Sequence, residues 1–126
     1  GMRFFFFFSI SNITLYHYSR CSKSRSALPL LEERGIQAHI VNYIDTPLNT
    51  EQLTTLLAQL GLSARELMRK GEAVYKDMQL DNPDLSEAEL IHAMTQAPIL
   101  MERPVLVVDQ RAAIGRPIDN LIEILP

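Results

Sequence analysis

The N-terminal third of the chain carries the pattern that most constrains its fold. Residues 12–17 are rich in β-branched and aromatic side chains, a helical stretch then ends at Gly35, and residues 38–44 are again strand-like. Two strands that flank one helix at this separation form a βαβ unit. Because the crossover helix returns the chain to the same end of the sheet, we expect the two strands to be parallel.

Pro29 is a local conflict inside the first helical stretch. A proline in a helix interior removes a backbone hydrogen bond and clashes with the preceding turn. Two outcomes would resolve the conflict. Either the helix kinks at Pro29, or its regular part begins late enough to place Pro29 in the first turn.

The C-terminal part of the chain has a different order of elements. Residues 105–108 are wholly apolar, Asp109-Gln110 favours a turn, and residues 112–114 can pair back as a hairpin. Pro117 then stands where a last helix would begin. The core face of that helix is predicted to hold three aliphatic side chains: Leu121, Ile122 and Leu125. A βαβ half and a ββα half around one mixed four-stranded sheet give an α/β fold of the thioredoxin-like plan.

A helical insertion of about residues 50–96 separates the two halves. Its first helix has one apolar stripe at helical spacing, formed by Leu53, Leu56, Leu57 and Leu60. A short helix is expected over residues 63–70, followed by a loop after Gly71 that contains Asn82-Pro83-Asp84. Ser86 and Glu89 form a capping box for a further helix with an apolar face of Leu90, Ile91 and Met94. No linker divides the chain, so residues 12–126 are predicted to be one domain.

Residues 1–11 are predicted to lie outside that domain. Gly1 before Met2 is typical of tag removal, and Phe4–Phe8 form an apolar extension. The run is too short to span a bilayer and lacks the cleavage site of a signal peptide. It either lengthens the first strand or packs on a neighbouring surface, unless the start is misassigned and the working domain begins near Ser11.

Charge and residue usage exclude several classes of protein. The net charge of −3 argues against a nucleic-acid-binding protein, which is usually basic. Cys21 is the one cysteine, which excludes an internal disulfide, a dithiol motif and a cysteine-built zinc site. The three histidines have no metal-ligand spacing, and the glycines form neither a Rossmann nor a P-loop pattern. We therefore expect no metal, no tightly bound cofactor and no membrane segment, and a cytoplasmic protein.

Cys21 follows the first strand and precedes the first helix, which places its thiol at a helix N-terminus. Free backbone N–H groups and the helix dipole favour negative charge there. Arg20, Lys23 and Arg25 are its neighbours in sequence, and His17 stands upstream. A buried inert thiol is the alternative interpretation. The polar and basic surroundings favour a reactive thiolate instead.

The stretch from His17 to Arg25 resembles the glutaredoxin-coupled arsenate reductase family, whose pattern is His-Asn-Pro-x-Cys-x-x-Ser-Arg. The resemblance covers Asn12 to Pro126 and includes three further motifs, at Arg65–Arg69, Pro98–Pro104 and Gly115–Pro117. The Cys-Ser-Lys-Ser-Arg version is most similar to a bacterial branch described as arsenate reductase-like. The sequence departs from the family pattern at Tyr18-Ser19 and at Pro29.

The resemblance implies a role for each matching residue. Cys21 would be the nucleophile that attacks arsenate, and three arginines would hold the oxyanion: Arg69, Arg103 and Arg116. Arginine suits this task because its charged planar fork matches a tetrahedral oxyanion. Arg116 is expected at the start of the last helix, and Pro104 is expected to be cis and to face the cysteine. Arg65 and Arg111 are interpreted as surface charges or ion pairs.

Three residues are expected to support the thiolate: His17, Ser24 and Arg25. The hydroxyl of Ser24 could donate to the thiolate or could simply cap the helix, and His17 could tune the thiol or bond the backbone. Because no second cysteine can resolve a Cys21–arsenate adduct, glutathione is the expected co-substrate and a glutaredoxin the expected partner. The family resemblance implies the same route, in which glutathione attacks the adduct and glutaredoxin reduces the resulting mixed disulfide.

Two other functions remain open at the level of sequence. A redox-sensing transcription regulator of the Spx type shares the fold, but such regulators usually sense with a CxxC pair, and Ser24 occupies the second position here. A glutathione-linked binding protein could keep the oxyanion site without turning over arsenate. The change at Tyr18-Ser19 keeps this second alternative open. Nothing in the sequence specifies the oligomeric state.

Overall fold

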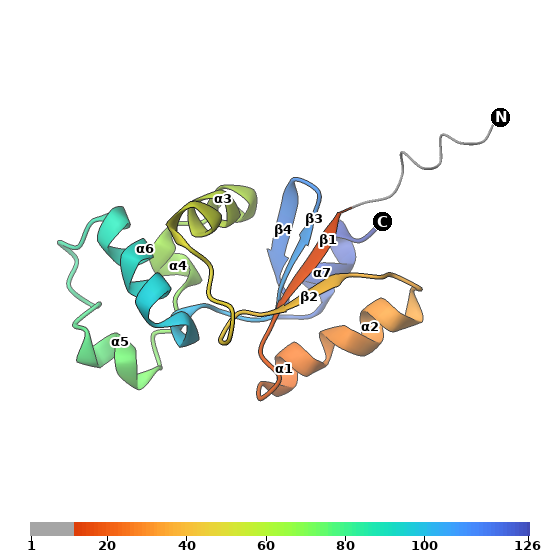
Figure 1. The fold of residues 1–126 in the computed structure, drawn as a ribbon, viewed down its shortest axis with the longest axis horizontal. Helices are drawn as coiled ribbons and strands as arrows, with labels where there is room; N and C mark the ends of the chain where they lie inside the picture. Colours follow the sequence, from red (N-terminus) through yellow and green to blue (C-terminus); the bar gives the residue numbers. More distant parts are fainter. Residues whose placement is uncertain (1–11) are drawn as a thin grey trace.

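A four-stranded mixed sheet organises the computed structural model, which describes residues 12–126 (Figure 1). The strand order is β2 (His39–Asn42), β1 (Ile13–His17), β3 (Val105–Val108) and β4 (Arg111–Ile114). β1 pairs with β2 in parallel and with β3 in antiparallel orientation, and β3 and β4 form the expected hairpin. The predicted thioredoxin-like α/β plan is therefore confirmed. The predicted N-terminal extension, residues 1–11, lies outside the described residues.

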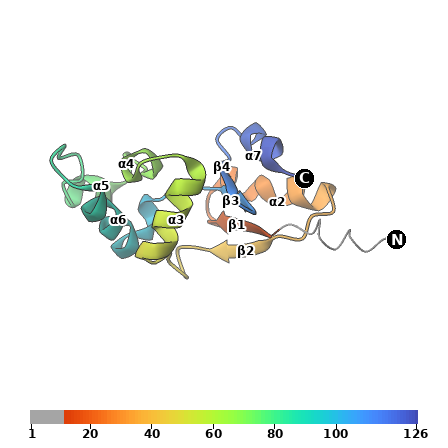
Figure 2. The same ribbon diagram turned by 90° about the horizontal axis from the view of Figure 1, so that it is seen from above.

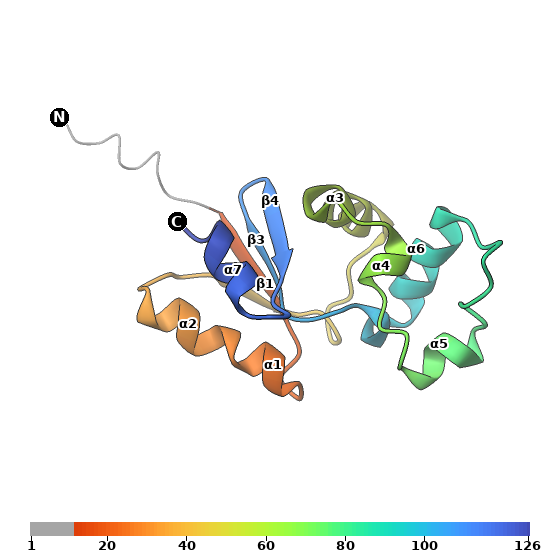
Figure 3. The same cartoon turned by 180° about the vertical axis from the view of Figure 1, so that it is seen from behind.

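Helices cover both faces of the sheet (Figures 1 and 3). α2 (Ala27–Glu33) and α7 (Asp119–Ile124) pack on one face, where Leu15, Leu31 and Leu106 are buried with Leu121. α3 (Thr50–Leu60) lies on the other side and contacts β4. α1 (Ser22–Arg25) precedes α2 and leads directly into it.

The two ends of α2 agree with the sequence-based expectations. Pro29 is the third residue of α2, so it lies in the first turn, where its missing N–H has no intrahelical partner to lose. The second of the two outcomes for Pro29 is therefore the observed one. Gly35 follows the helix with a φ of 65°, and the Ile36 N–H donates to the Leu31 carbonyl to close the turn.

The helical insertion forms the other half of the molecule (Figure 2). It contains α3, α4 (Ala64–Leu67), α5 (Ala73–Asp77), α6 (Glu87–Gln96) and the 3₁₀ helix η2 (Pro98–Leu100). The Ser86–Glu89 capping box is present at α6, as predicted. The prediction of a loop after Gly71 is wrong in part, because α5 forms at the beginning of that segment. That helix is a little over one turn long and buries Tyr75, which is too short a segment to show helical periodicity.

The last helix corrects two predictions. It begins at Asp119, so Pro117 is not its first residue and Arg116 lies in the connection between β4 and α7. Ile122 is 38% exposed and does not belong to the core face, whereas Leu121 is buried and Leu125 packs against the same core, as predicted. Ile124 is buried in the place expected for Ile122. Residues three apart lie on one face of a helix, whereas the next residue turns away from it. No helix within residues 12–126 has both the length and the apolar character needed to cross a membrane.

Candidate functional site

Cys21 is the N-cap residue of α1 and lies just beyond the end of β1. The intervening turn is closed by a 3.0 Å hydrogen bond from the Cys21 N–H to the Tyr18 carbonyl. The thiol is partly exposed, and the backbone N–H groups of Lys23 and Ser24 donate toward it. The junction of strand and helix therefore presents the sulfur to solvent with main-chain donors behind it.

The surroundings of Cys21 favour its thiolate form. Burial is the largest single influence and raises the pKa of the Cys21 thiol. The backbone N–H of Ser24, the side chain of Arg103, the backbone N–H of Lys23 and the charge of Arg116 together outweigh it, so the net pKa is below the ordinary value. Arg116 Nη2 donates to Cys21 Sγ over 3.3 Å. A larger fraction of Cys21 is thus nucleophilic near neutral pH than for a free cysteine.

Two loops bring Arg103 and Arg116 to the thiol. The Gly115 N–H donates to the Pro104 carbonyl at 2.8 Å, and Arg116 Nε donates to the Arg103 carbonyl at 2.9 Å. A Cβ at position 115 would lie only 2.8 Å from Pro104 Cγ, so glycine permits this close approach. The Arg103–Pro104 peptide bond is cis, as the resemblance implies.

Arg103 is 5% exposed and is fixed from several directions. Its Nη1 donates to the Ile99 carbonyl at 3.1 Å and lies 3.5 Å from the Tyr43 hydroxyl. Its guanidinium carbon is 4.8 Å from the centre of the Tyr18 ring, a cation–π distance. Its Nε is buried without a hydrogen-bond partner. Burial raises the pKa of Tyr43 to about 12, so that hydroxyl stays protonated and donates to the Met101 carbonyl.

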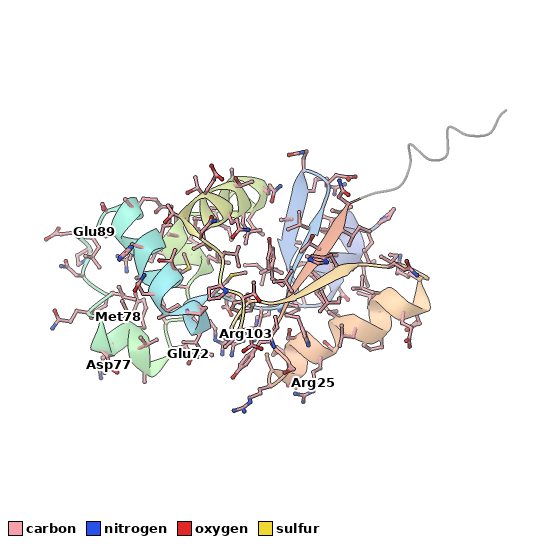
Figure 4. All side chains as sticks on the ribbon, in the orientation of Figure 1. Arg25, Glu72, Asp77, Met78, Glu89 and Arg103 are labelled. Carbon is pink, nitrogen blue, oxygen red and sulfur yellow. The ribbon has the colours of Figure 1, made fainter. Side chains whose placement is uncertain are left out.

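Arg69 reaches the site from the connection between α4 and α5 in the insertion. Its Nε donates to Glu72 Oε2 and its Nη1 to Glu102 Oε1, each over 3.0 Å. Glu102 Oε1 is also 3.4 Å from Arg116 Nε, and Glu72 Oε2 is 4.0 Å from Arg103 Nη2. Two carboxylates thus link the three predicted arginines into one network. Figure 4 shows Glu72 and Arg103 near the junction of the two halves.

Glu72 and Glu102 are site residues that the sequence patterns did not predict. Both stand close to predicted arginines in the chain, because Glu102 directly precedes Arg103 and Glu72 is three residues after Arg69. An acidic residue beside each arginine motif was the available signal. Sequence alone could not indicate that Glu102 bridges Arg69 to Arg116, because that contact depends on how the insertion meets the sheet.

The three residues expected to support the thiolate occupy different places. His17 Nδ1 is hydrogen-bonded to Ser24 Oγ at 2.8 Å, and Ser24 Oγ also accepts the Tyr18 N–H at 2.9 Å. The Ser24 hydroxyl is therefore engaged within the turn, and the residue meets Cys21 through its backbone N–H. Arg25 Nη1 donates to the Ser19 carbonyl at 2.9 Å. His17 and Arg25 thus act on the turn that holds Cys21.

Burial, the largest influence, lowers the pKa of His17, and the charge of Arg25 lowers it further, while a hydrogen bond with Ser24 opposes them. The imidazole is consequently neutral at neutral pH. His17 therefore adds no positive charge beside Cys21. It supports the site by holding Ser24, whose backbone N–H donates to the sulfur.

The two remaining arginines lie outside the network. Arg65 donates to the Tyr75 hydroxyl and to the Leu80 and Asn82 carbonyls, so it is a structural link and not the expected surface charge or ion pair. Arg111 is exposed and donates to the Glu123 carbonyl at 3.4 Å, as expected of a surface charge.

The chemistry of the site is that of a nucleophile beside a set of anion-binding groups. A thiolate-favouring cysteine lies within hydrogen-bond distance of Arg116, and the network of Arg69, Arg103 and Arg116 offers planar donors suited to a tetrahedral oxyanion. Within residues 12–126, histidine, cysteine and acidic side chains nowhere gather in a group of three suited to holding a metal ion.

Comparison with known proteins agrees with this fold. Arsenate reductase of Neisseria meningitidis serogroup A is 46% identical over 114 residues, covering 90% of this chain and 97% of that protein. Uncharacterized protein YfgD of Escherichia coli is 47% identical over 114 residues, covering 90% and 96%. The solved structure of arsenate reductase from Vibrio cholerae is 40% identical, with a TM-score of 0.88 and coverage of 91% of this chain and 98% of that one.

The family model described as the ArsC family matches residues 16–124. That range contains Cys21 and the arginine network, and it runs through both halves of the molecule. Together with relatives that are similar over nine-tenths of the chain, the match establishes the family. This chain belongs to the ArsC family.

Proposed function

We propose that this protein is an arsenate reductase that converts arsenate to arsenite with Cys21 as its nucleophile. The hydrogen bond from Arg116 Nη2 to Cys21 Sγ carries the proposal, because it joins the thiol to the anion-binding network. A bound tetrahedral oxyanion would lie beside a sulfur that is already biased toward its thiolate form. Relatives with 46% identity that are named arsenate reductase support this choice of substrate.

The first chemical step is nucleophilic substitution at arsenic. The Cys21 thiolate attacks the arsenic atom, a sulfur–arsenic bond forms, and an arsenic–oxygen bond breaks to release water after proton transfer. Arsenic stays in the +5 state in this step. Arg69, Arg103 and Arg116 would hold the remaining oxygens and stabilise their negative charge.

The reduction itself requires two electrons from two thiols. Arsenate and two thiols give arsenite, one disulfide and water, and this sequence holds one cysteine. We therefore propose that glutathione attacks the Cys21 adduct and supplies the second thiol. A glutaredoxin would then reduce the resulting mixed disulfide and regenerate the Cys21 thiolate. These partners belong to a reducing compartment, so we expect the protein to act in the cytoplasm.

A glutathione-linked oxyanion-binding protein without turnover is the second candidate. The observation that favours it is the Tyr18 ring, which contacts Arg103 where the family pattern has asparagine in the same loop. A regulator of the Spx type receives no comparable support, because the second position of its CxxC motif is Ser24, whose hydroxyl is bonded to His17.

The test is arsenate-dependent oxidation of NADPH in the presence of glutathione, glutaredoxin and glutathione reductase. We expect turnover that stops when glutaredoxin is omitted. Turnover that continues without glutaredoxin would overturn the proposed role of glutaredoxin but would still show that the protein reduces arsenate. No turnover, with Cys21 still alkylated as a low-pKa thiolate, would favour the binding protein.

A further inference from the structure

Two of the three guanidinium nitrogens of Arg69 already bind carboxylates. Arg69 Nε and Nη1 bind Glu72 and Glu102, each over 3.0 Å, so this guanidinium has a carboxylate on two of its nitrogens. A carboxylate and an oxyanion use the same planar guanidinium donors. A ligand that binds Arg69 in this way would have to take the place of a carboxylate.

Glu102 is the closer competitor for the reacting centre. Its Oε1 lies 3.0 Å from Arg69 Nη1 and 3.4 Å from Arg116 Nε, and another nitrogen of Arg116 donates to Cys21 Sγ. The carboxylate therefore shares one guanidinium with the sulfur. An oxyanion bound to Cys21 and Arg116 would meet Glu102 directly.

The charges of the resting site cancel. Three guanidinium groups face two carboxylates and, when Cys21 is deprotonated, one thiolate, which leaves no net formal charge. A doubly charged anion gains little attraction from a neutral cluster but much from arginines freed of their carboxylates. The Glu72 and Glu102 side chains are 25% and 26% exposed, so each has a route toward solvent.

We propose that Glu102, supported by Glu72, is an internal competitor of the oxyanion. In the resting protein the carboxylates hold the arginine donors, and a bound oxyanion displaces Glu102 toward solvent. The pair therefore weakens oxyanion binding and favours doubly charged ligands, which outcompete a carboxylate, over singly charged ones, which only match it. This inference rests on the proposed function, because it concerns the same oxyanion site.

Sulfate and nitrate are suitable probes, because they differ in charge and need no turnover. Each anion is titrated against the rate at which iodoacetamide alkylates Cys21, which gives a dissociation constant from protection of the thiol. Glu102→Gln keeps an oxygen that accepts from Arg69 but removes the charge. We expect it to bind sulfate about tenfold more tightly than the unmodified protein and to discriminate less against nitrate.

Two further variants separate displacement from a general charge effect. Glu89→Gln makes the same change in net charge at the capping box of α6, far from Arg103 in Figure 4, and should leave sulfate binding unchanged. Glu102→Asp keeps the charge but shortens the reach to Arg69, so displacement predicts tighter sulfate binding than in the unmodified protein. A general charge effect predicts no change for Glu102→Asp.

The inference is overturned if Glu102→Gln binds sulfate no more tightly than the unmodified protein, or if Glu89→Gln has the same effect. Thermal unfolding of each variant confirms that the fold is kept. Arsenate turnover by the unmodified protein tests the proposed function separately. Turnover combined with unchanged sulfate binding in Glu102→Gln would refute only the internal competitor, whereas tighter sulfate binding without turnover would refute only the proposed reaction.

Discussion

The sheet half and the helical insertion contribute different things to the site. The sheet half supplies Cys21 at the end of β1 and holds Arg103 and Arg116 through backbone contacts between neighbouring loops. The insertion supplies Arg69 and Glu72, whose side chains contact each other and Arg103. The Arg69 N–H also donates to the Leu100 carbonyl at 2.7 Å, so a main-chain hydrogen bond anchors this part of the insertion. The sheet half thus provides the nucleophile and the two arginines beside it, whereas the insertion adds one further arginine and a carboxylate.

This difference assigns separate tasks to the two halves. Every influence that lowers the pKa of Cys21 comes from the sheet half and its flanking loops: Ser24, Lys23, Arg103 and Arg116. Arg69 is not among them and instead bridges Glu72 and Glu102. We infer that the sheet half activates the nucleophile and that the insertion adjusts how strongly an oxyanion is held.

Replacing the nucleophile should have the largest effect. Cys21→Ser puts a hydroxyl in place of the thiol, and a hydroxyl stays protonated near neutral pH and is a much weaker nucleophile than a thiolate. We expect arsenate turnover to fall by more than about 1,000-fold, with protein stability nearly unchanged, since the side chain is partly exposed. The coupled NADPH assay measures the loss. Full activity in this variant would refute the proposed mechanism.

A matched pair of arginine variants tests the division of tasks. Arg116→Gln removes the donor and the charge beside the sulfur, so the pKa of Cys21 should rise and the alkylation rate at neutral pH should fall. Arg69→Gln should leave that pKa nearly unchanged and raise the KM for arsenate about tenfold, through loss of one charged contact. The dependence of the iodoacetamide rate on pH reads out the first effect, and steady-state kinetics read out the second.

The sign of the pH dependence follows from the direction of the Cys21 shift. Because its pKa lies below the ordinary thiol value, the rate of alkylation should rise with pH, and the midpoint of this rise should lie at lower pH than for a free cysteine. In Arg116→Gln the same curve should move to higher pH. Equal curves for the two arginine variants would contradict the division of tasks.

The packing of the two halves can be compared at one glycine from each, Gly115 in the sheet half and Gly71 in the insertion. A Cβ at Gly115 would lie 2.8 Å from Pro104 Cγ and 3.0 Å from Leu121 Cδ1, whereas a Cβ at Gly71 has no heavy atom within 4 Å. Gly115→Ala should therefore destabilise the protein by about 1–3 kcal/mol. Gly71→Ala should change stability by less than about 0.5 kcal/mol. Urea unfolding of both variants measures the difference, and equal values would show that the contact between the loops carries little packing energy.

Sequence patterns predicted the parts of this molecule that depend on local order. The βαβ unit, the hairpin, the capping box at Ser86 and the position of Cys21 at a strand-to-helix junction all follow from short-range spacing and are present. The start of α7 was predicted two residues early. Proline is common at the first position of a helix, but a helix need not begin wherever a proline stands. Propensity alone could not decide between these starts.

The parts that could not be predicted depend on contacts between distant segments. Glu102 bridges Arg69 and Arg116 only because the insertion returns to the sheet at η2. The Ser24 hydroxyl is hydrogen-bonded to His17 and to the Tyr18 N–H, and it is the backbone N–H of Ser24 that donates to the sulfur. The sequence left open whether this hydroxyl would bind the thiolate or cap the helix. A list of motif residues therefore identifies members of the site, while their hydrogen-bond partners come from the fold.

Tyr18 should give the smallest effect, and it tests how the sheet half orients Arg103. The ring centre lies 4.8 Å from the guanidinium carbon, and such a contact contributes about 0.5–1 kcal/mol at a partly exposed position. Tyr18→Phe keeps the ring and should keep the affinity for sulfate. Tyr18→Leu loses it and should weaken sulfate binding about two- to fivefold, measured by protection of Cys21 from alkylation. If the two variants behave alike, the ring does not orient Arg103, and the hydrogen bond to the Ile99 carbonyl is enough to hold that guanidinium in place.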